Sequence, residues 1–255
     1  MKKLTLPFLA AAALLPATLH AQQPTAPKFA ERPFSAFLFA WGPSLDADLR
    51  VADPRNGAPI DFSARAKAGN LIENIDSAFM AYIDHTAGDW SVFGDWSYTK
   101  LSPSANLNPA SGFSRADTSL KSQFGDIAVS YRLAGEGSTR LEGFGGARYY
   151  DLKNVVVLRS ATGDLGTRKR DDFVDAVIGA RARWQPAPGW SAVAQADFGA
   201  GGTERSWQGW AYVGYQFDWG SVGLGWRYLR FVREHSGNSS DLAFNGPLAG
   251  FVARF

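Results

Sequence analysis

Short segments in which every second residue is apolar recur along most of this chain, separated by turn residues. In 172–184, for example, Val174 and Ile178 fall on one side of an extended strand, and Asp175 and Arg181 fall on the other. This two-residue period predicts β-strands with one apolar and one polar face. The chain must therefore form a sheet whose apolar face is covered along its whole length.

We predict ten strands from this pattern. They are 34–42, 77–85, 90–101, 122–133, 140–150, 172–184, 190–200, 207–219, 221–233 and 242–255. Their lengths suit tilted strands that cross a bilayer, which need about 9–11 residues, and long and short connections alternate between them. The predicted fold is all-β, a single transmembrane antiparallel up-and-down β-barrel of ten strands. Eight or twelve strands, and a soluble lipocalin-like barrel, are the alternatives.

The N-terminus has the composition of a secretory signal peptide. Lys2 and Lys3 precede an apolar run over 4–15, and Leu19-His20-Ala21 provides a cleavage site with a small final residue. The run is too short and wrongly flanked for a membrane-spanning helix. The predicted divisions are a cleaved signal peptide (1–21), a periplasmic lead (22–33) and the barrel (34–255). Together these predict export to the outer membrane of a Gram-negative bacterium.

Charge and composition exclude several classes of function. The chain has 26 basic and 24 acidic residues, and the predicted signal peptide contains two of the lysines and no acid. The remainder is neutral and has no basic run, so we expect no nucleic acid partner. There is no cysteine, which excludes disulfides. The 9 Trp, 8 Tyr and 18 Phe, without a long apolar run, are typical of a membrane barrel.

The faces predicted to line the lumen carry both charge signs. The candidates are Asp84, Asp95, Asp126, Arg132, Glu142, Arg148, Asp175, Arg181, Arg183, Asp197, Arg227 and Arg254. Isolated charges in a narrow lumen are costly, so we expect them to pair or stay hydrated. Two interpretations follow: a structural network that fills a small barrel, or a narrow pore for small hydrophilic solutes. The mixed signs imply no strong ion selectivity.

Aromatic residues flank the short connections, where an interfacial girdle is expected. The predicted membrane-interface aromatics are Trp184, Trp190, Tyr215, Phe217, Trp219 and Phe255. The chain ends GFVARF (250–255), which resembles the terminal strand signal read by the barrel-assembly machinery. We therefore expect two partners, outer-membrane lipids and this machinery, the latter through the strand that ends in Phe255.

Enzymatic motifs are missing from the sequence. No nucleophile elbow, zinc-binding motif, phosphate loop or calcium loop occurs, so we predict no enzyme, no cofactor and no metal. Beyond the signal peptide the only histidines are His85, beside a short turn, and His235, near Asp241 on an outer loop. An outer-membrane hydrolase that uses His235 is the least favoured hypothesis.

The first long connection, 43–80, is the most distinctive loop. Leu71, Ile72 and Ile75 have near-helical spacing, which predicts either a short helix over the barrel mouth or a surface loop. Because loops carry function more often than the scaffold does, surface binding or adhesion is the alternative function.

Several strand patterns resemble those of a known group. They are NLIENIDSAFMAYID (70–84), WSVFGDWSY (90–98), GARYYDL (146–152), GARARW (179–184), GWRYL (225–229) and GPLAGFVARF (246–255). The chain is similar here to a group of small proteobacterial outer-membrane β-barrel proteins, mostly uncharacterised in function. It departs from them at Gly42-Pro43-Ser44, where the group has a more extended glycine-rich turn. The resemblance implies one barrel in the outer membrane and no particular substrate.

Overall fold

The computed structural model describes residues 34–52, 59–66, 75–102, 104–106, 114–159, 163–217, 220–235 and 238–254. The predicted signal peptide and periplasmic lead lie outside these ranges, as do Trp219 and Phe255. No helix among the described residues is long and apolar enough to cross a membrane.

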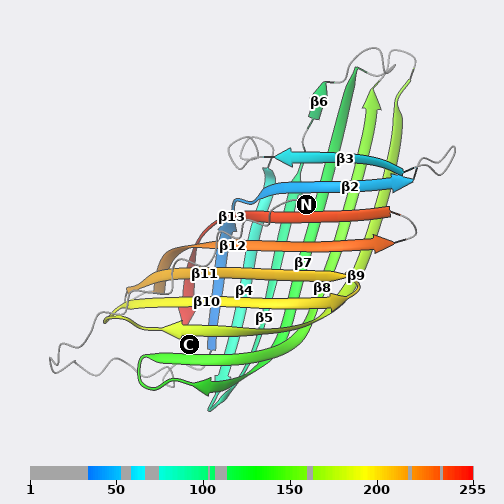
Figure 1. Cartoon of the computed structure of the whole chain (residues 1–255). Helices are drawn as coiled ribbons and strands as arrows, with labels where there is room; N and C mark the ends of the chain where they lie inside the picture. The colour runs from blue at the N-terminus through cyan, green and yellow to red at the C-terminus, as the bar shows by residue number, and fades with distance from the viewer. Residues whose placement is uncertain are drawn as a thin grey trace, which may run out of the picture.

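Ten strands form a closed antiparallel barrel (Figure 1). They are β1 (Phe34–Trp41), β4 (Ile75–Ala87), β5 (Trp90–Leu101), β7 (Arg115–Ala134), β8 (Thr139–Arg159), β9 (Leu165–Trp184), β10 (Trp190–Gly201), β11 (Arg205–Phe217), β12 (Gly220–His235) and β13 (Asn238–Arg254). The first and last strands close the barrel, with Ser35 opposite Arg254 and Trp41 opposite Leu248. The prediction of a ten-stranded barrel is confirmed, and closure pairs β1 with β13, whose edges would otherwise invite aggregation.

Only connections of two to five residues lie at one end of the barrel, here called the short-turn end. The other, the long-loop end, has the two longest connections, from β1 to β4 and from β5 to β7. Gly88 and Asp89 join β4 to β5, and the φ of 61° at Gly88 is a left-handed conformation that favours glycine. Phe34 lies opposite His85, so β1 begins at the short-turn end, where β13 also ends.

The first long connection is neither a helix nor an irregular loop over most of its described length, which corrects the prediction. It forms a hairpin of β2 (Ser44–Ala52) and β3 (Pro59–Ala66), and β2 pairs with the part of β13 nearest the long-loop end. Since Trp41 pairs with Leu248 and Ser44 with Asn245, β1 and β2 follow β13 in one continuous register. Leu71 and Ile72 lie outside the described residues, and Ile75 begins β4.

Three neighbouring strands extend well beyond their predicted bounds. β7, β8 and β9 have 20, 21 and 20 residues, whereas β10 has 12. Their extra length lies at the long-loop end, where the short strand β6 (Ser104–Asn106) adds to β7 (Figure 1). The barrel wall is therefore taller on this side than a membrane crossing requires.

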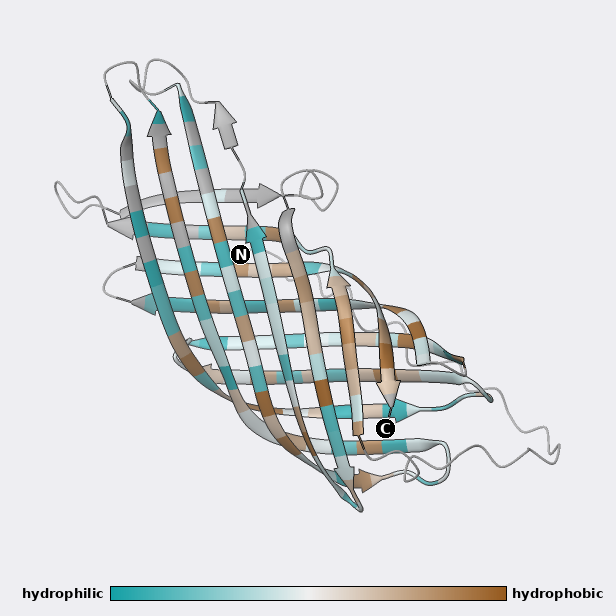
Figure 2. Cartoon of the chain, turned by 180° about the vertical axis from the view of Figure 1, so that it is seen from behind, coloured by the Kyte–Doolittle hydropathy of each residue, from teal (hydrophilic) through white to brown (hydrophobic). Residues whose placement is uncertain are grey.

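Apolar residues cover the outside of the barrel between two rows of aromatic side chains. Hydrophobic and hydrophilic residues alternate along the strands (Figure 2), and Ile178 is 71% and Leu224 69% exposed to the surroundings. One row, at the short-turn end, includes Trp90 and Tyr131, whose ring centroids are 4.9 Å apart. Tyr98 belongs to the other row, at the long-loop end. The stretch from Trp90 to Tyr98 has the length of a tilted strand that crosses a bilayer. So large an exposed apolar surface is suited to lipid.

Candidate functional site

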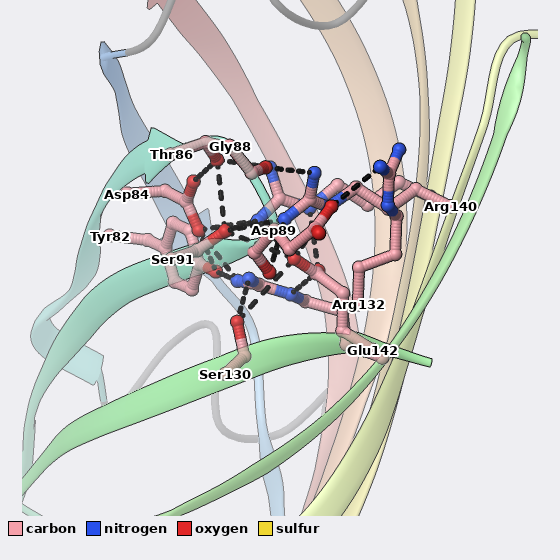
Figure 3. A network of polar contacts seen from close by, with 12 residues as sticks. Tyr82, Asp84, Thr86, Gly88, Asp89, Ser91, Ser130, Arg132, Arg140 and Glu142 are labelled. Carbon is pink, nitrogen blue, oxygen red and sulfur yellow. Dashed lines mark hydrogen bonds and ion pairs between the residues drawn. The ribbon is translucent and has the colours of Figure 1, made fainter. Parts of the chain in front are cut away.

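The lumen contains a network of buried ion pairs near the short-turn end (Figure 3). Glu142 of β8 is its centre and accepts hydrogen bonds from Nε of Arg140 at 2.8 Å, Arg181 at 2.8 Å and Arg183 at 3.0 Å. Asp84 of β4 binds Arg181 at 2.7 Å and Arg183 at 2.8 Å. Every one of these side chains sits at an inward position, as the two-residue period of its strand dictates.

Hydroxyl groups complete this network. Ser91 donates to Glu142 at 3.0 Å, Thr86 donates to Asp84 at 3.1 Å, and Ser130 accepts from Arg181 at 3.0 Å. Arg140 also donates to the backbone carbonyls of Gly88 and Asp89, at 2.8 and 3.0 Å. The network thereby ties the β4–β5 turn to β8.

A second network crosses the middle of the lumen. Arg148 binds Asp126 through Nε at 2.6 Å and Asp197 through Nη2 at 2.8 Å. Gln208 donates to both carboxylates, at 3.2 and 3.1 Å, and its oxygen accepts from Nη2 of Arg227 at 2.6 Å. Arg148, Arg181 and Arg227 are among the largest fully buried side chains of the protein. Charges buried so completely persist only because they are paired and hydrogen-bonded.

Aromatic layers lie beside these networks. Towards the long-loop end, Tyr150 stacks on Phe173 with centroids 4.6 Å apart and meets Phe231 edge-on at 5.0 Å. Phe124 meets Phe244 at 5.1 Å in the same layer. Side chains thus fill the lumen in alternating charged and aromatic layers, as small barrels allow.

Two small polar features adjoin the layers. The hydroxyl of Tyr150 donates to Asp175 at 3.2 Å, and Asp175 also accepts from the backbone and hydroxyl of Thr203 at 2.8 and 2.7 Å. Nearer the short-turn end, a cavity of about 40 Å³ is lined by Asp84 and Arg183 among others. It has room for water and not for a sugar-sized solute.

The predicted lumen residues lie in three situations. Ten lie inside the barrel wall: Asp84, Asp95, Asp126, Glu142, Arg148, Asp175, Arg181, Arg183, Asp197 and Arg227. Arg132 pairs in register with Glu142 but lies beside the β4–β5 turn at the short-turn end, where its side chain is 43% exposed in an ion pair with Asp89. Arg254 pairs through its backbone with Ser35, and its side chain lies outside the described residues.

The predicted interface aromatics lie on the outer wall where they are described. Trp184, Trp190, Tyr215 and Phe217 are all exposed, between 40% and 51%. A second aromatic row, which was not predicted, lies at the long-loop end, where Phe79 stacks on Tyr98 at 5.6 Å and Trp207 on Tyr228 at 4.3 Å.

Two inward residues were also missed. Arg140 shares the strand and the parity of Glu142, so the two-residue period was a sufficient signal for it. Gln208 carries no charge, and only its position between Asp126 and Arg227 reveals its part in the second network.

The long-loop end carries ion pairs of another kind, exposed to solvent. Arg159 binds Asp117 at 3.0 Å and Asp164 at 2.5 Å, and its hydrogen bond, with that of Arg115, holds the pKa of the Asp117 carboxyl below its usual range. Arg230 binds Asp241 at 2.8 and 2.6 Å.

His85 lies outside both networks. His85 is exposed on β4, at the short-turn end. His235 pairs through its backbone with Asn238, and its side chain is not among those described. Within the described ranges, no three His, Asp or Glu side chains are grouped so as to hold a metal ion.

No protein-family model and no curated protein matches the chain. Among solved structures, it is similar to the outer membrane protease OmpT from Escherichia coli, with a TM-score of 0.63 and 10% identity over 89% of this chain and 98% of that one. The translocator domain of the autotransporter NalP from Neisseria meningitidis matches with a TM-score of 0.45 and 13% identity, over 88% of each chain. At these identities the likeness to OmpT shows the fold alone, that of an outer-membrane β-barrel.

Proposed function

We propose that this chain is an outer-membrane barrel whose lumen is a structural, non-conducting plug and whose long-loop end is a surface for binding outside the cell. The observation that carries this proposal is the complete burial of Arg148, Arg181 and Arg227, each of which is ion-paired with a carboxylate on a non-adjacent strand (Asp197, Asp84 and Asp95). The passage of an ion or solute would require these pairs to separate, which would leave uncompensated charges buried in the lumen. This favours the structural role over the narrow pore.

The long-loop end supports the binding role. There β7, β8 and β9 continue past the aromatic row at the long-loop end. The β2–β3 hairpin pairs with β13 at the same end. These extensions are unnecessary for crossing a membrane, and exposed segments on a rigid scaffold are common sites of recognition. The short-turn end, by contrast, has only tight connections.

Single-channel recording in planar bilayers tests the plug. We expect purified protein to insert without discrete conductance steps. Steps that recur in independent preparations, and are abolished when heat-denatured protein is used, would contradict the plug and restore the narrow-pore hypothesis.

Replacement of 45–65 by a short Gly-Ser linker tests the binding surface. We expect the variant to lose adhesion of expressing cells to host cells or matrix, while the barrel remains heat-modifiable on gels. A matched control replaces the turn 135–138 at the opposite end and should leave adhesion unchanged. Equal adhesion by both variants would remove the hairpin from the proposed surface.

We infer no enzymatic activity for the long-loop end. The carboxylates of Asp151, Asp171 and Asp241 each hold an arginine, which leaves them poorly placed to serve a histidine. The hydrolase hypothesis still has a direct test: loss of a peptidase or lipase activity on His235→Ala would reinstate it.

A further inference from the structure

Four basic residues lie side by side on the outside of the barrel, on β5 and the three tall strands β7, β8 and β9. We call them the basic row. Lys100 of β5 pairs in register with Lys121 of β7, Lys121 with Lys153 of β8, and Lys153 with Arg170 of β9. Four adjacent strands therefore each contribute a cation at the same level of the sheet.

All four side chains are on the outer face. Each shares the parity of outward apolar residues on its own strand, such as Ile127 for Lys121 and Ile178 for Arg170. Lys121 is exposed, and the side chains of Lys153 and Arg170 are 38% and 55% exposed.

The basic row lies just beyond the aromatic row at the long-loop end. Tyr98, which stacks on Phe79, is two residues before Lys100 on the same face of β5. At about 3.3 Å per residue, this places the ammonium-bearing residue about 7 Å further along the strand. Aromatic rows mark the boundary of the hydrocarbon layer, so the basic row lies at the level of lipid headgroups.

Such an arrangement is unfavourable without a counter-ion. Like charges directly opposite each other on adjacent strands destabilise a sheet. Asp151 offsets part of the repulsion, since it binds Arg170 at 3.1 Å and Lys153 at 3.4 Å. Asp172 is also exposed on this face, but Arg168 adds a further cation beyond it. The exposed cations Lys121, Lys153, Arg168 and Arg170 outnumber these two carboxylates.

We propose that the basic row binds the phosphate groups of a phosphorylated glycolipid in the outer leaflet, the lipid A portion of lipopolysaccharide. Several neighbouring cations at headgroup depth match its two phosphates, and its acyl chains would lie along the apolar wall below. The inference goes beyond the proposed binding role of the loops, because the ligand here is part of the membrane. It would also explain why a row of like charges is tolerated.

The opposite wall supplies a matched control. Arg205 of β11 is exposed two residues beyond Trp207, just as Lys100 stands beyond Tyr98, but its partner in register on β12 is Val232. Arg205 is thus a cation at a similar height that has no cation opposite it in register on β12.

Native mass spectrometry of the detergent-solubilised barrel with bisphosphorylated lipid A tests the proposal. Because a basic residue at a membrane surface contributes about fivefold in affinity, we expect Lys121→Gln with Lys153→Gln to weaken binding about 25-fold. Arg205→Gln should change it less than about twofold, and dephosphorylated lipid A should not discriminate between the wild type and the double variant.

Thermal unfolding compares the stability of the double variant and the wild type without and with lipid A, and the order of the two should reverse. Without lipid A, the double variant should be as stable as the wild type or more so, because like-charge repulsion is removed. With lipid A, the wild type should gain more than the variant. Equal lipid A affinity of the wild type and the double variant would overturn the proposal. Displacement of lipid A by millimolar inorganic phosphate or by heparin would also overturn it, in favour of a soluble anion.

Discussion

Arginine–carboxylate pairs of nearly the same length occur in two regions of this barrel with different surroundings. In the lumen, Arg148 meets Asp126 at 2.6 Å and the two side chains are 1% and 4% exposed. At the long-loop end, Arg159 meets Asp117 at 3.0 Å and the side chains are 49% and 32% exposed. The distance alone therefore does not determine what a pair contributes, because water competes only in the second region.

This difference assigns different roles to the two ends. Removing one partner in the lumen leaves a charge that neither water nor another residue can easily compensate. Removing one at the long-loop end leaves a charge that water solvates at once. The lumen is thus the part that fixes the fold, and the long-loop end is free to change its residues.

The largest predicted effect is that of Arg181→Met. It removes the buried cation that bridges Glu142 and Asp84, which are 0% and 3% exposed, and leaves Arg183 as the one described cation that they share. We expect the free energy of unfolding to fall by about 3–5 kcal/mol. Equilibrium unfolding in urea, in the presence of lipid vesicles, measures it. The matched variant Arg159→Met should unfold at the same urea concentration as the wild type. Similar losses in both variants would show that burial does not distinguish the two kinds of ion pair.

Gly246→Ala tests the junction between the two regions. A methyl group there would lie 2.7 Å from the backbone carbon of Gly42 and 2.8 Å from Cα of Pro43, where the β1–β2 strand bends against β13. Backbone must move, so we expect a loss of about 1–3 kcal/mol in the same unfolding assay. Gly145→Ala, whose nearest neighbour would be 3.8 Å away, is the control and should be neutral.

The sequence predicts the part of the barrel within the lipid layer better than the part at the long-loop end, for a physical reason. Within the lipid layer one face must be apolar, and strands such as 172–184 show a clear period of two. Beyond the layer both faces are polar. The run Arg168-Lys169-Arg170-Asp171-Asp172 therefore resembles a loop, although it continues β9.

Neighbours across strands are harder still to infer. The parity of Arg181 is readable from the sequence, but its meeting with Asp84, about a hundred residues away, depends on register and closure. The same is true of the basic row, because Lys100, Lys121 and Lys153 become a group only when three strands align. The β2–β3 hairpin was missed because its alanines and the later Leu71-Ile72 favoured a helix.

The smallest predicted effect concerns the Asp117 carboxyl. The hydrogen bonds from Arg159 and Arg115 lower its pKa below the usual 3.8, so this contact stabilises the folded form above pH 3.8 and is lost as the pH falls through the lowered pKa. Arg159→Gln should move the pKa of Asp117 back towards 3.8, as followed by carbon NMR of the side-chain carboxyl in micelles. Arg230→Gln, which removes a pair with Asp241 instead, should leave it unchanged. Because both partners are exposed, the urea midpoint of Arg159→Gln should stay that of the wild type. A pKa that moves while the midpoint does not would separate local electrostatics at the long-loop end from the global stability that the lumen provides.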